Sequence, residues 1–369
     1  MFLPDLFIQR IFTITNMNSI RSILIKLFTL IVPIYILSAC NKNDDPVIQN
    51  NWQTIYQNND LHLYSIKFLD KNYGVIMAET EAVHGISDWK FVLSTEDGGN
   101  TWDQITCSTI DTTIQFPLYD IGFVHLISKN VLLATGYNVH ISTDNGKTWR
   151  NVSPQWAGAS INDLYVLDSL TWLVAKGTEI FRTNNAGQTW QNVFHTDFMG
   201  ALERFSFPSP KVGYINDCVV DMDHNLSAGL IVKTIDGGQS WTILKPEPWN
   251  SNKIILPYVV AMQFNNELEG YLSTIADSKL FKTLDGGNNW ELINNNCYTN
   301  GLQYFITGQI GYSSDGKIIY VTNDSGKTWQ IDYNNNTDSD ILTWTFLKNE
   351  QGFATTRDHR IIKNINSLN

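Results

Sequence analysis

The sequence has few basic residues and lacks the common signatures of metal and phosphate sites. Its 25 Lys and Arg residues are outnumbered by 36 Asp and Glu residues, which gives a formal net charge of −11. Because such a surface repels nucleic acid, we expect no DNA or RNA partner. The seven His residues show no HExxH or HxxxH spacing, and no Gly-rich segment continues into Gly-Lys-Ser/Thr. The sequence therefore predicts no metal site, no cofactor and no phosphate-cradling loop.

Cysteine is also scarce. Cys40 lies in an N-terminal apolar segment, whereas Cys107, Cys218 and Cys297 are far apart and form no CxxC pair. An odd number of widely spaced cysteines favours free, buried thiols over a disulfide framework or a metal site. We expect these three thiols to be free and buried, with a disulfide or a metal site as the alternative.

What the sequence does contain is a short phrase that occurs six times. The copies read STEDGGNTW, STDNGKTW, TNNAGQTW, TIDGGQSW, TLDGGNNW and TNDSGKTW, and they end at Trp102, Trp149, Trp190, Trp241, Trp290 and Trp329. Successive Trp residues are separated by 39 to 51 residues. A repeat of this length is typical of a four-stranded propeller blade.

Each phrase lies between two short apolar stretches, which predicts a hairpin turn. Asp and Asn side chains hydrogen-bond nearby turn amides, and Gly supplies positive φ angles. The Trp would bury a large apolar ring against the neighbouring blade. The acidic position of the phrase is occupied by Asp97, Asp144, Asn185, Asp236, Asp285 and Asp324. Because a carboxylate recurs on the same turn of each repeat, we interpret these residues as structural and assign no catalytic role to them.

A second spacing precedes most of the phrases. An apolar residue is followed six positions later by Gly, as Phe68 is by Gly74, and the third repeat keeps the spacing with Val166 and Trp172. The second repeat is less regular and aligns at Phe123. We interpret the apolar residue, called the anchor below, as the end of the innermost strand of each blade.

The last repeat is incomplete, and the N-terminal end of the repeat region can complete it. The segment ILTWTFLKNEQGFATTRDHRIIKN has the early strands of a blade but neither the phrase nor its Trp, whereas NWQTIY carries Trp52. Pairing the two ends would leave no open sheet edge. The sequence therefore predicts an all-β fold, a single seven-bladed β-propeller of four-stranded antiparallel blades over residues 51–369, closed by an N-terminal strand.

The N-terminal segment carries the second clear signal. Residues 23–37 are almost wholly apolar, follow Arg21, and lead into Leu-Ser-Ala-Cys ending at Cys40. This pattern resembles the lipobox of bacterial lipoproteins, in which a lipid is attached to the Cys and cleavage precedes it. A transmembrane anchor is the alternative, but the stretch is short for a membrane span.

These features divide the chain into three parts. Residues 1–39 are interpreted as a signal peptide, with Met17 as an alternative start, and residues 40–50 as a tether lipidated at Cys40. The non-acidic Lys42 after the Cys and the pair Asp44-Asp45 favour the outer membrane, with export to the cell surface. We therefore expect an envelope lipoprotein that reaches the membrane through its lipid.

The repeats resemble those of Asp-box (BNR) repeat proteins over nearly all of the chain after the leader. Sialidases of this group bind a carboxylate with three arginines, the first in an Arg-Ile-Pro motif that is absent here. The arginines after the leader are few and dispersed, namely Arg150, Arg182, Arg204, Arg357 and Arg360. Xyloglucan-degrading hydrolases have two propellers, and sortilin-type receptors have ten blades, whereas this sequence predicts one propeller of seven blades.

The seven-bladed photosystem II assembly and stability factors are the most similar of these groups. They share the order of apolar residue, Gly-Tyr or Gly-Phe, Asp-box and Trp, and often a lipoprotein leader. The resemblance implies a non-catalytic chaperone that docks on nascent membrane subunits. Because their arginine-rich patch has no obvious counterpart here, we expect a relative that does binding or assembly work at the envelope.

A binding face can be predicted at the mouth of the propeller. Three residues before each anchor lie Ser65, Asp120, Asp163, Arg204, Ala261, Leu302 and Thr343. Charged residues thus gather in blades two to four, and the preceding loops carry aromatic residues. The predicted binding residues are Asp120, Asp163, Glu203, Arg204, Trp156 and Trp249. The alternative is an inter-blade salt bridge between Asp163 and Arg204, with the aromatic rings packed under loops.

Two functions from different classes follow. The first is a non-catalytic, monomeric propeller scaffold that binds a protein partner or a glycan. The second is a surface glycoside hydrolase in which two of Asp120, Asp163 and Glu203 act as acid and base. A hydrolase would need its two carboxyl groups about 5–5.5 Å or 6.5–9.5 Å apart across an open cleft.

Overall fold

The computed structural model describes residues 51–80, 90–109, 123–154, 156, 160–197, 200–221, 226–244, 259–274, 278–297, 302–335, 339–347 and 351–365. The chain divides into two compact units, Met1–Val47 and Ile48–Asn369, and every described residue lies in the second. Among the described residues, no helix has the length and apolar character needed to cross a membrane.

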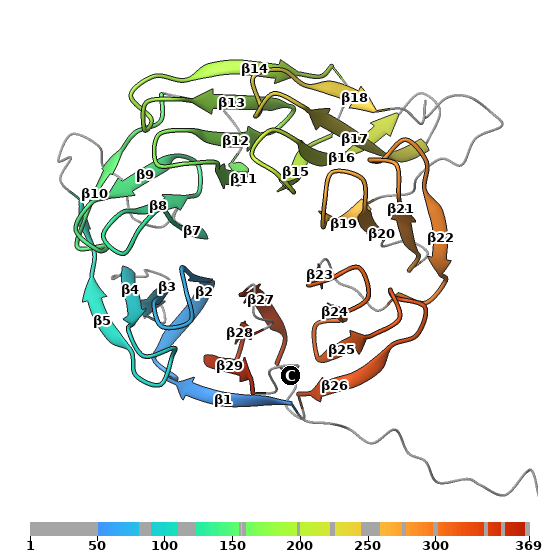
Figure 1. The fold of residues 1–369 in the computed structure, drawn as a ribbon. Coiled ribbons are helices and arrows are strands. Elements are labelled where there is room, and N and C mark those ends of the chain that lie inside the picture. Colours follow the sequence, from blue (N-terminus) through green and yellow to red (C-terminus); the bar gives the residue numbers. More distant parts are fainter. Residues whose placement is uncertain are drawn as a thin grey trace, which may run out of the picture. The chain divides into compact units, whose positions relative to one another are not determined.

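Seven antiparallel sheets stand around a central axis, as predicted (Figure 1). Blade one contains β2 (Leu61–Phe68), β3 (Gly74–Thr80), β4 (Lys90–Thr95) and β5 (Asp103–Thr106). Blade two contains β7 (Phe123–Leu126), β8 (Leu132–Thr135), β9 (Val139–Ser142) and β10 (Thr148–Asn151). A short strand, β6 (Ser108–Thr109), pairs in parallel with the outer edge of β10. Blade three contains β11 (Ile161–Val166), β12 (Trp172–Lys176), β13 (Glu179–Thr183) and β14 (Gln191–His195).

The other four blades repeat the same order from the axis outward. Blade four contains β15 (Leu202–Ser206), β16 (Gly213–Asp221), β17 (Leu226–Thr234) and β18 (Thr242–Leu244). Blade five contains β19 (Val259–Phe264), β20 (Gly270–Thr274), β21 (Leu280–Thr283) and β22 (Glu291–Asn294). Blade six contains β23 (Leu302–Phe305), β24 (Gly311–Ser314), β25 (Ile318–Thr322) and β26 (Gln330–Asn334). Blade seven contains β27 (Ile341–Phe346), β28 (Gly352–Thr356), β29 (Arg360–Asn364) and β1 (Trp52–Gln57).

Blade seven closes the ring with a strand from the start of the repeat region. β1 runs antiparallel to β29, from Trp52 opposite Asn364 to Gln57 opposite Arg360. The predicted closure is therefore confirmed, and no blade lacks an outer strand.

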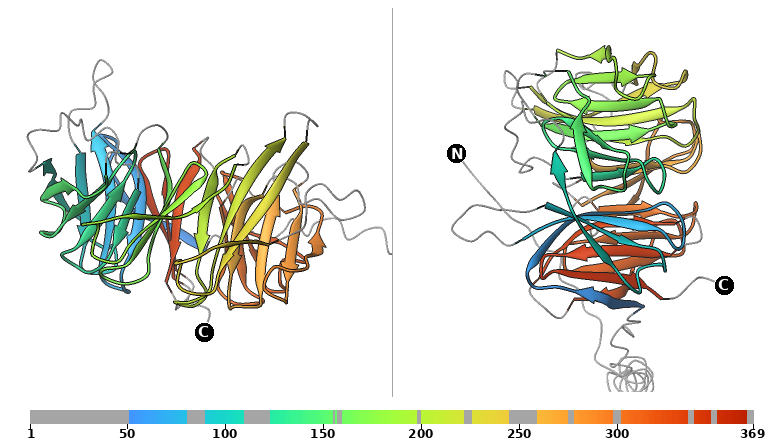
Figure 2. Two further views of the ribbon diagram at one scale, coloured as in Figure 1. Left: turned by 90° about the horizontal axis from the view of Figure 1, so that it is seen from above. Right: turned by 90° about the vertical axis from the view of Figure 1, so that its left-hand side faces the viewer.

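The two faces of the ring carry different turns. The Asp-box turns lie beside the turns between the first and second strands, since the Gly98 amide donates to the Asn72 carbonyl at 2.8 Å. We call this side the box face. The other side, the loop face, carries the turns between second and third strands and the connections between blades. The β16–β17 hairpin, whose two strands have nine residues each, projects on the loop face (Figure 2).

The packing of the anchors explains the six-residue spacing. Phe68 pairs across the turn with Gly74, and a Cβ atom added to Gly74 would lie only 2.6 Å from the Phe68 ring. The ring therefore occupies the space that a side chain would need. Its other face stacks on Phe353 of blade seven, with ring centroids 3.8 Å apart, while Trp102 meets its edge at 6.1 Å. Phe68 thus joins two blades, and Gly74 makes room for it.

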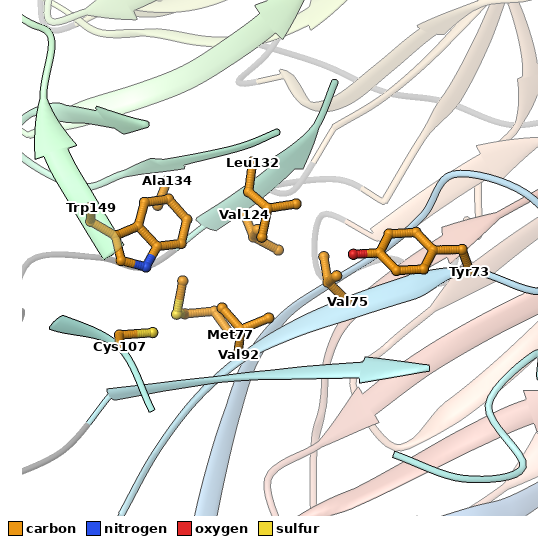
Figure 3. Packing of buried hydrophobic residues seen from close by; sticks show 9 residues of the cluster. All are labelled: Tyr73, Val75, Met77, Val92, Cys107, Val124, Leu132, Ala134 and Trp149. Atoms are coloured by element: carbon orange, nitrogen blue, oxygen red, sulfur yellow. The ribbon is translucent and has the colours of Figure 1, made fainter. Parts of the chain in front are cut away.

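Between the blades lie apolar clusters that form the core. Figure 3 shows the cluster between blades one and two, where the fully buried Trp149 of the second Asp-box lies with Met77 and Val92 of blade one. Cys107 lies in the same cluster and Cys297 in a corresponding one, and both are buried and form no disulfide, as predicted. The side chain of Cys218 lies outside the described residues, so the prediction for that thiol is untested.

The Asp-box of blade two shows why the phrase has its composition. The Ser142 hydroxyl accepts from the Gly146 amide and donates to Asp144, both at 2.8 Å. The Asp144 carboxylate accepts from the amide and the hydroxyl of Thr148, at 2.9 and 2.6 Å. The Trp149 indole N–H donates to the Gly146 carbonyl at 2.8 Å. The carboxylate is thus bonded to its own turn.

The blade-three box shows that an amide can replace the carboxylate. The Asn185 oxygen accepts from the Thr189 amide at 2.9 Å, and its NH₂ group donates to the Thr189 hydroxyl at 2.8 Å. Only the direction of the second hydrogen bond changes. The box therefore requires a hydrogen-bonding side chain of this shape and not a charge.

We expect Asp144→Ala to lower the free energy of unfolding by about 1–2 kcal/mol, because turn donors lose their acceptor. Asp144→Asn should lower the free energy of unfolding by less than half as much at pH 7. Burial acts to raise the pKa of Asp144, but hydrogen bonds from Thr148 and Ser142 hold that pKa below its ordinary value. A lowered folded-state pKa stabilises the fold above the unfolded pKa of about 3.9 and loses this contribution as pH falls below it. Urea unfolding at pH 7 and pH 3 should therefore show a smaller difference between parent and Asn variant at pH 3.

Candidate functional site

The innermost strands line the axis, and side chains of one blade satisfy the backbone of the next. The Asp163 carboxylate on β11 accepts from the Phe205 amide of β15 at 2.8 Å. The Gln263 amide group on β19 both accepts from the Phe305 amide and donates to its carbonyl, each at 2.7 Å. These bonds satisfy backbone groups at the free edges of the inner strands and tie neighbouring blades together.

Asp163 is consequently committed to backbone bonding. Its second oxygen accepts from the Leu164 amide at 2.9 Å. Burial raises the pKa of Asp163, while the charge of Arg204 and the bond from Phe205 oppose that rise. The predicted residue therefore lies at the axis, but both of its oxygens already bind backbone amides.

Two basic side chains accompany this carboxylate around the axis. Lys67 lies on β2 in blade one, and burial lowers its pKa, against the attraction of Asp163 and with the repulsion of Arg204. These charges belong to blades one, three and four, and they interact with one another. Two basic side chains, Lys67 and Arg204, thus accompany Asp163 at the axis of a protein whose formal net charge is −11.

His125 on β7 adds a neutral polar group from blade two. Burial, followed by the nearby charge of Lys67, lowers the pKa of His125 to about 3, so the ring is neutral at physiological pH. Its Nε2 atom is buried and has no hydrogen-bond partner among the described residues. We call Lys67, His125, Asp163 and Arg204 the axial cluster.

The axial cluster differs in part from the predicted site. The salt bridge between Asp163 and Arg204, which was the alternative to this site, is not formed: within the described ranges no ion pair joins them, and Arg204 is exposed. Lys67 and His125 were not predicted. Each directly precedes an anchor in the sequence. An alignment that includes the residue just before each anchor, and not only the third residue before it, would have identified both.

The alignment of blade two in the sequence analysis was wrong. β7 pairs with β8 through Leu126 opposite Leu132, which makes Leu126 the anchor in place of Phe123. The position equivalent to Asp163 in this blade is therefore the exposed Phe123 and not Asp120. The alignment failed because this blade has no Gly after its inner strand to mark the register. Asp120 itself lies outside the described residues.

Of the two predicted aromatic binding residues, Trp156 lies among the described residues. Trp156 packs against Phe181 and Trp190, with ring centroids 5.1 and 5.6 Å away, and the Lys176 ammonium lies 5.9 Å from its ring. Trp156 is therefore part of the cluster between blades two and three. This agrees with the alternative in which the aromatic rings are packed against the protein. Trp249 lies outside the described residues.

Glu203 is the second residue of the inner strand of blade four, one residue before Arg204. Its carboxylate accepts from the Asn216 side chain of β16 at 3.5 Å. Asn216 is fully buried and also donates to the Val259 carbonyl of blade five at 3.3 Å. Glu203 thus lies near the boundary of blades four and five, turned toward its own second strand.

Comparisons with known proteins agree with this architecture. The family model of the photosynthesis system II assembly factor YCF48 matches residues 45–217. A structure of YCF48 bound to a D1 peptide has a TM-score of 0.62 and 18% identity, over 86% of this chain and 97% of that one. YCF48 from Cyanidioschyzon merolae has a TM-score of 0.62 and 19% identity, over 85% and 98% of the two chains.

Other propellers are similar at lower scores. The GH74 xyloglucanase from Xanthomonas campestris has a TM-score of 0.54 and 11% identity, over 83% of this chain and 59% of that one. No curated protein sequence matches the chain. At these identities the structural likeness shows the fold, and the family model adds the repeat pattern. The chain is thus an Asp-box seven-bladed β-propeller that resembles the photosystem II assembly factors.

Proposed function

We propose that this protein is a non-catalytic propeller scaffold that binds a polypeptide partner at its axis, and that a lipid on Cys40 holds it at the outer membrane of a bacterial envelope. The observation that carries the binding proposal is the axial cluster. Lys67 and Arg204 supply two basic side chains, while the carboxylate of Asp163 beside them is bonded to the backbone amides of Leu164 and Phe205.

The chemistry of the axial cluster favours an acidic ligand. A cation in a partly buried site attracts a carboxylate more strongly than it would in water. The unpartnered Nε2 atom of His125 offers a further hydrogen bond. We therefore propose an extended segment of a protein partner that presents an acidic side chain or a terminal carboxylate. The likeness to YCF48, one of whose structures contains a D1 peptide, supports a peptide over a glycan.

Glycoside hydrolysis has weaker support. It rests on the fold of GH74 enzymes, of which this chain spans 59% and 50% in two cases. A hydrolase needs one carboxylic acid that donates a proton and one free carboxylate. Asp163 has both oxygens bonded to amides, and Glu203 accepts from Asn216. These contacts favour the binding scaffold.

An array of extended peptides, each made with acidic residues and with the matching amides, tests the binding proposal. The purified full chain should bind acidic members more tightly, with an affinity that falls as salt rises. Arg204→Ala should weaken that binding at least tenfold, about 1.4 kcal/mol. Arg150→Ala is the matched control, because Arg150 is exposed on the outer strand β10 and should leave binding unchanged.

The opposite pattern would refute the proposal. Equal binding of acidic and amide peptides, or equal effects of the two arginine variants, would place the site elsewhere. Release of sugars from a glycan, abolished by Asp163→Asn in a folded variant, would establish the hydrolase instead.

A further inference from the structure

Exposed apolar side chains gather on the box face. Among the described residues, ten large hydrophobic side chains are exposed, and six of them lie on box-face turns or at the end of β29 on that face. We call these six the box-face tips. They are Leu69 (44% exposed), Leu170 (53%), Ile235 (70%), Leu268 (59%), Leu284 (65%) and Ile365 (47%). Exposed hydrophobic residues that are scattered singly need no explanation, but a majority of them on one face of the ring does.

The turns themselves do not need these side chains. Ile235 and Leu284 occupy the second position of their boxes, where the box of blade one has Glu96 and that of blade two has Thr143. The hydrogen bonds of the box come from the flanking residues, such as Thr283 and Asp285 in blade five. Neither exposure nor turn geometry thus explains the choice of Ile and Leu.

Ile365 extends the pattern to blade seven. It follows Asn364, which pairs with Trp52 at the place where the other blades begin their box. Its amide donates to the Asn51 carbonyl at 2.8 Å, so Ile365 lies beside the point where the chain enters the propeller.

The tips are spread over the ring in two groups. In blades three to five, neighbouring box turns are linked, since the Arg182 guanidinium donates to Gly237 at 3.3 Å and the Lys233 ammonium to Gly286 at 3.4 Å. Leu170, Ile235, Leu268 and Leu284 lie on these turns and on the turns beside them. Leu69 and Ile365 belong to blades one and seven, on the other side of the axis (Figure 1). A planar surface meets both groups at once, whereas a peptide in a groove does not.

The place where the chain enters the propeller indicates which planar surface this is. β1 begins at the box face, and Asn51 lies eleven positions after Cys40. At about 3.5 Å per residue, that segment spans at most about 40 Å. A lipid on Cys40 would therefore keep the box face within reach of the bilayer surface.

From these observations we propose that the box face docks on a lipid bilayer, with the box-face tips inserted among the lipid headgroups and the loop face directed away from the membrane. The proposal rests on the lipid anchor of the proposed function. Because Asp236 and Asp285 lie beside the tips, the expected surface is zwitterionic lipid, without a requirement for anionic lipid.

The test uses the full chain, purified from bacterial membranes and reconstituted into phosphatidylcholine vesicles that contain a nitroxide-labelled lipid. A fluorescent amino acid is placed at position 235 or 284, and as controls at position 137 on the loop face or 292 on the outer strand β22. Tyr137 and Leu292 are also exposed apolar residues, 55% and 43%. We expect nitroxide quenching at positions 235 and 284 to be at least threefold greater than at the two controls.

A second measurement uses the variant Ile235→Ser with Leu284→Ser. Its melting temperature should equal that of the parent, because both side chains are exposed. Quenching of a probe at position 268 should fall at least twofold in this variant, and should stay unchanged in Leu292→Ser.

Two further outcomes would overturn the proposal. Equal quenching at all positions would mean that the ring has no preferred face toward the membrane. Shielding of position 235 without vesicles, together with concentration-dependent dimers, would mean that a second copy covers the tips. A chain without lipid on Cys40 would refute only the anchor. In that case a lipid coupled to the Cys40 thiol restores the tether, and the same quenching pattern decides the orientation.

Discussion

Deletion of Asn51 to Tyr56 is expected to melt the propeller far below the parent or to leave it aggregated. The segment supplies Trp52, which is 2% exposed and packs edge-on against Tyr312 and Phe346 with ring centroids 6.3 and 6.0 Å away. Loss of a buried Trp costs about 3–5 kcal/mol, against a total stability of about 5–15 kcal/mol for a domain.

The deletion also removes two hydrogen bonds from a buried carboxylate. The Trp52 indole N–H donates to Asp332 at 2.8 Å, and the Asn51 side chain donates to its other oxygen at 2.5 Å. Burial raises the pKa of Asp332, and these two bonds oppose that rise. Without Asn51 and Trp52, Asp332 would lose both hydrogen bonds at the boundary of blades six and seven. β29 would also become an open edge that pairs with other chains.

Circular dichroism melts and size-exclusion chromatography measure both effects. Gln53→Ala is the matched control, because Gln53 is an exposed residue of the same strand and should change stability by less than about 0.5 kcal/mol. A deletion variant that melted like the parent and remained monomeric would contradict the role of β1 in closing the ring.

Phe264→Ala should have the largest effect of any single substitution considered, about 3–5 kcal/mol. The ring is 4% exposed and stacks on Tyr214 of blade four with centroids 3.5 Å apart, while the Trp290 ring meets its edge at 5.9 Å. Its removal would open a cavity between blades four and five. Phe123→Ala is the control, since this inner-strand Phe is 41% exposed and should cost less than about 1 kcal/mol.

Gly270 provides a sharper test of the same contact. A Cβ atom at Gly270 would lie 2.7 Å from the Phe264 ring, so Gly270→Ala should cost about 1–3 kcal/mol through overpacking. The double variant should be less destabilised than the sum of the two singles, because the missing ring leaves room for the methyl group. Additive losses in urea unfolding would show that the ring and the Gly are not coupled.

Much of the fold follows from local chemistry that the sequence displays directly. The Asp-box repeats because its Ser or Thr, Asp and Gly satisfy a turn within a few residues, so its signature does not depend on the neighbouring blades. The incomplete last repeat and the early Trp52 predicted closure for the same reason. Where that local signal was weak, in blade two without a Gly after Leu126, the predicted register and the placement of Asp120 failed.

The sequence by itself therefore determined the number of blades, the strand that closes the ring and the structural role of the box. Only the tertiary structure decided which side chains meet. Lys67, Asp163 and Arg204 belong to three different blades and interact because the ring brings the inner strands to one axis. The same closure directs the bonds of Asp163 to the backbone of the next blade and sets the box-face tips on one side. Such relations depend on contacts between residues far apart in the chain, which a repeat pattern does not specify.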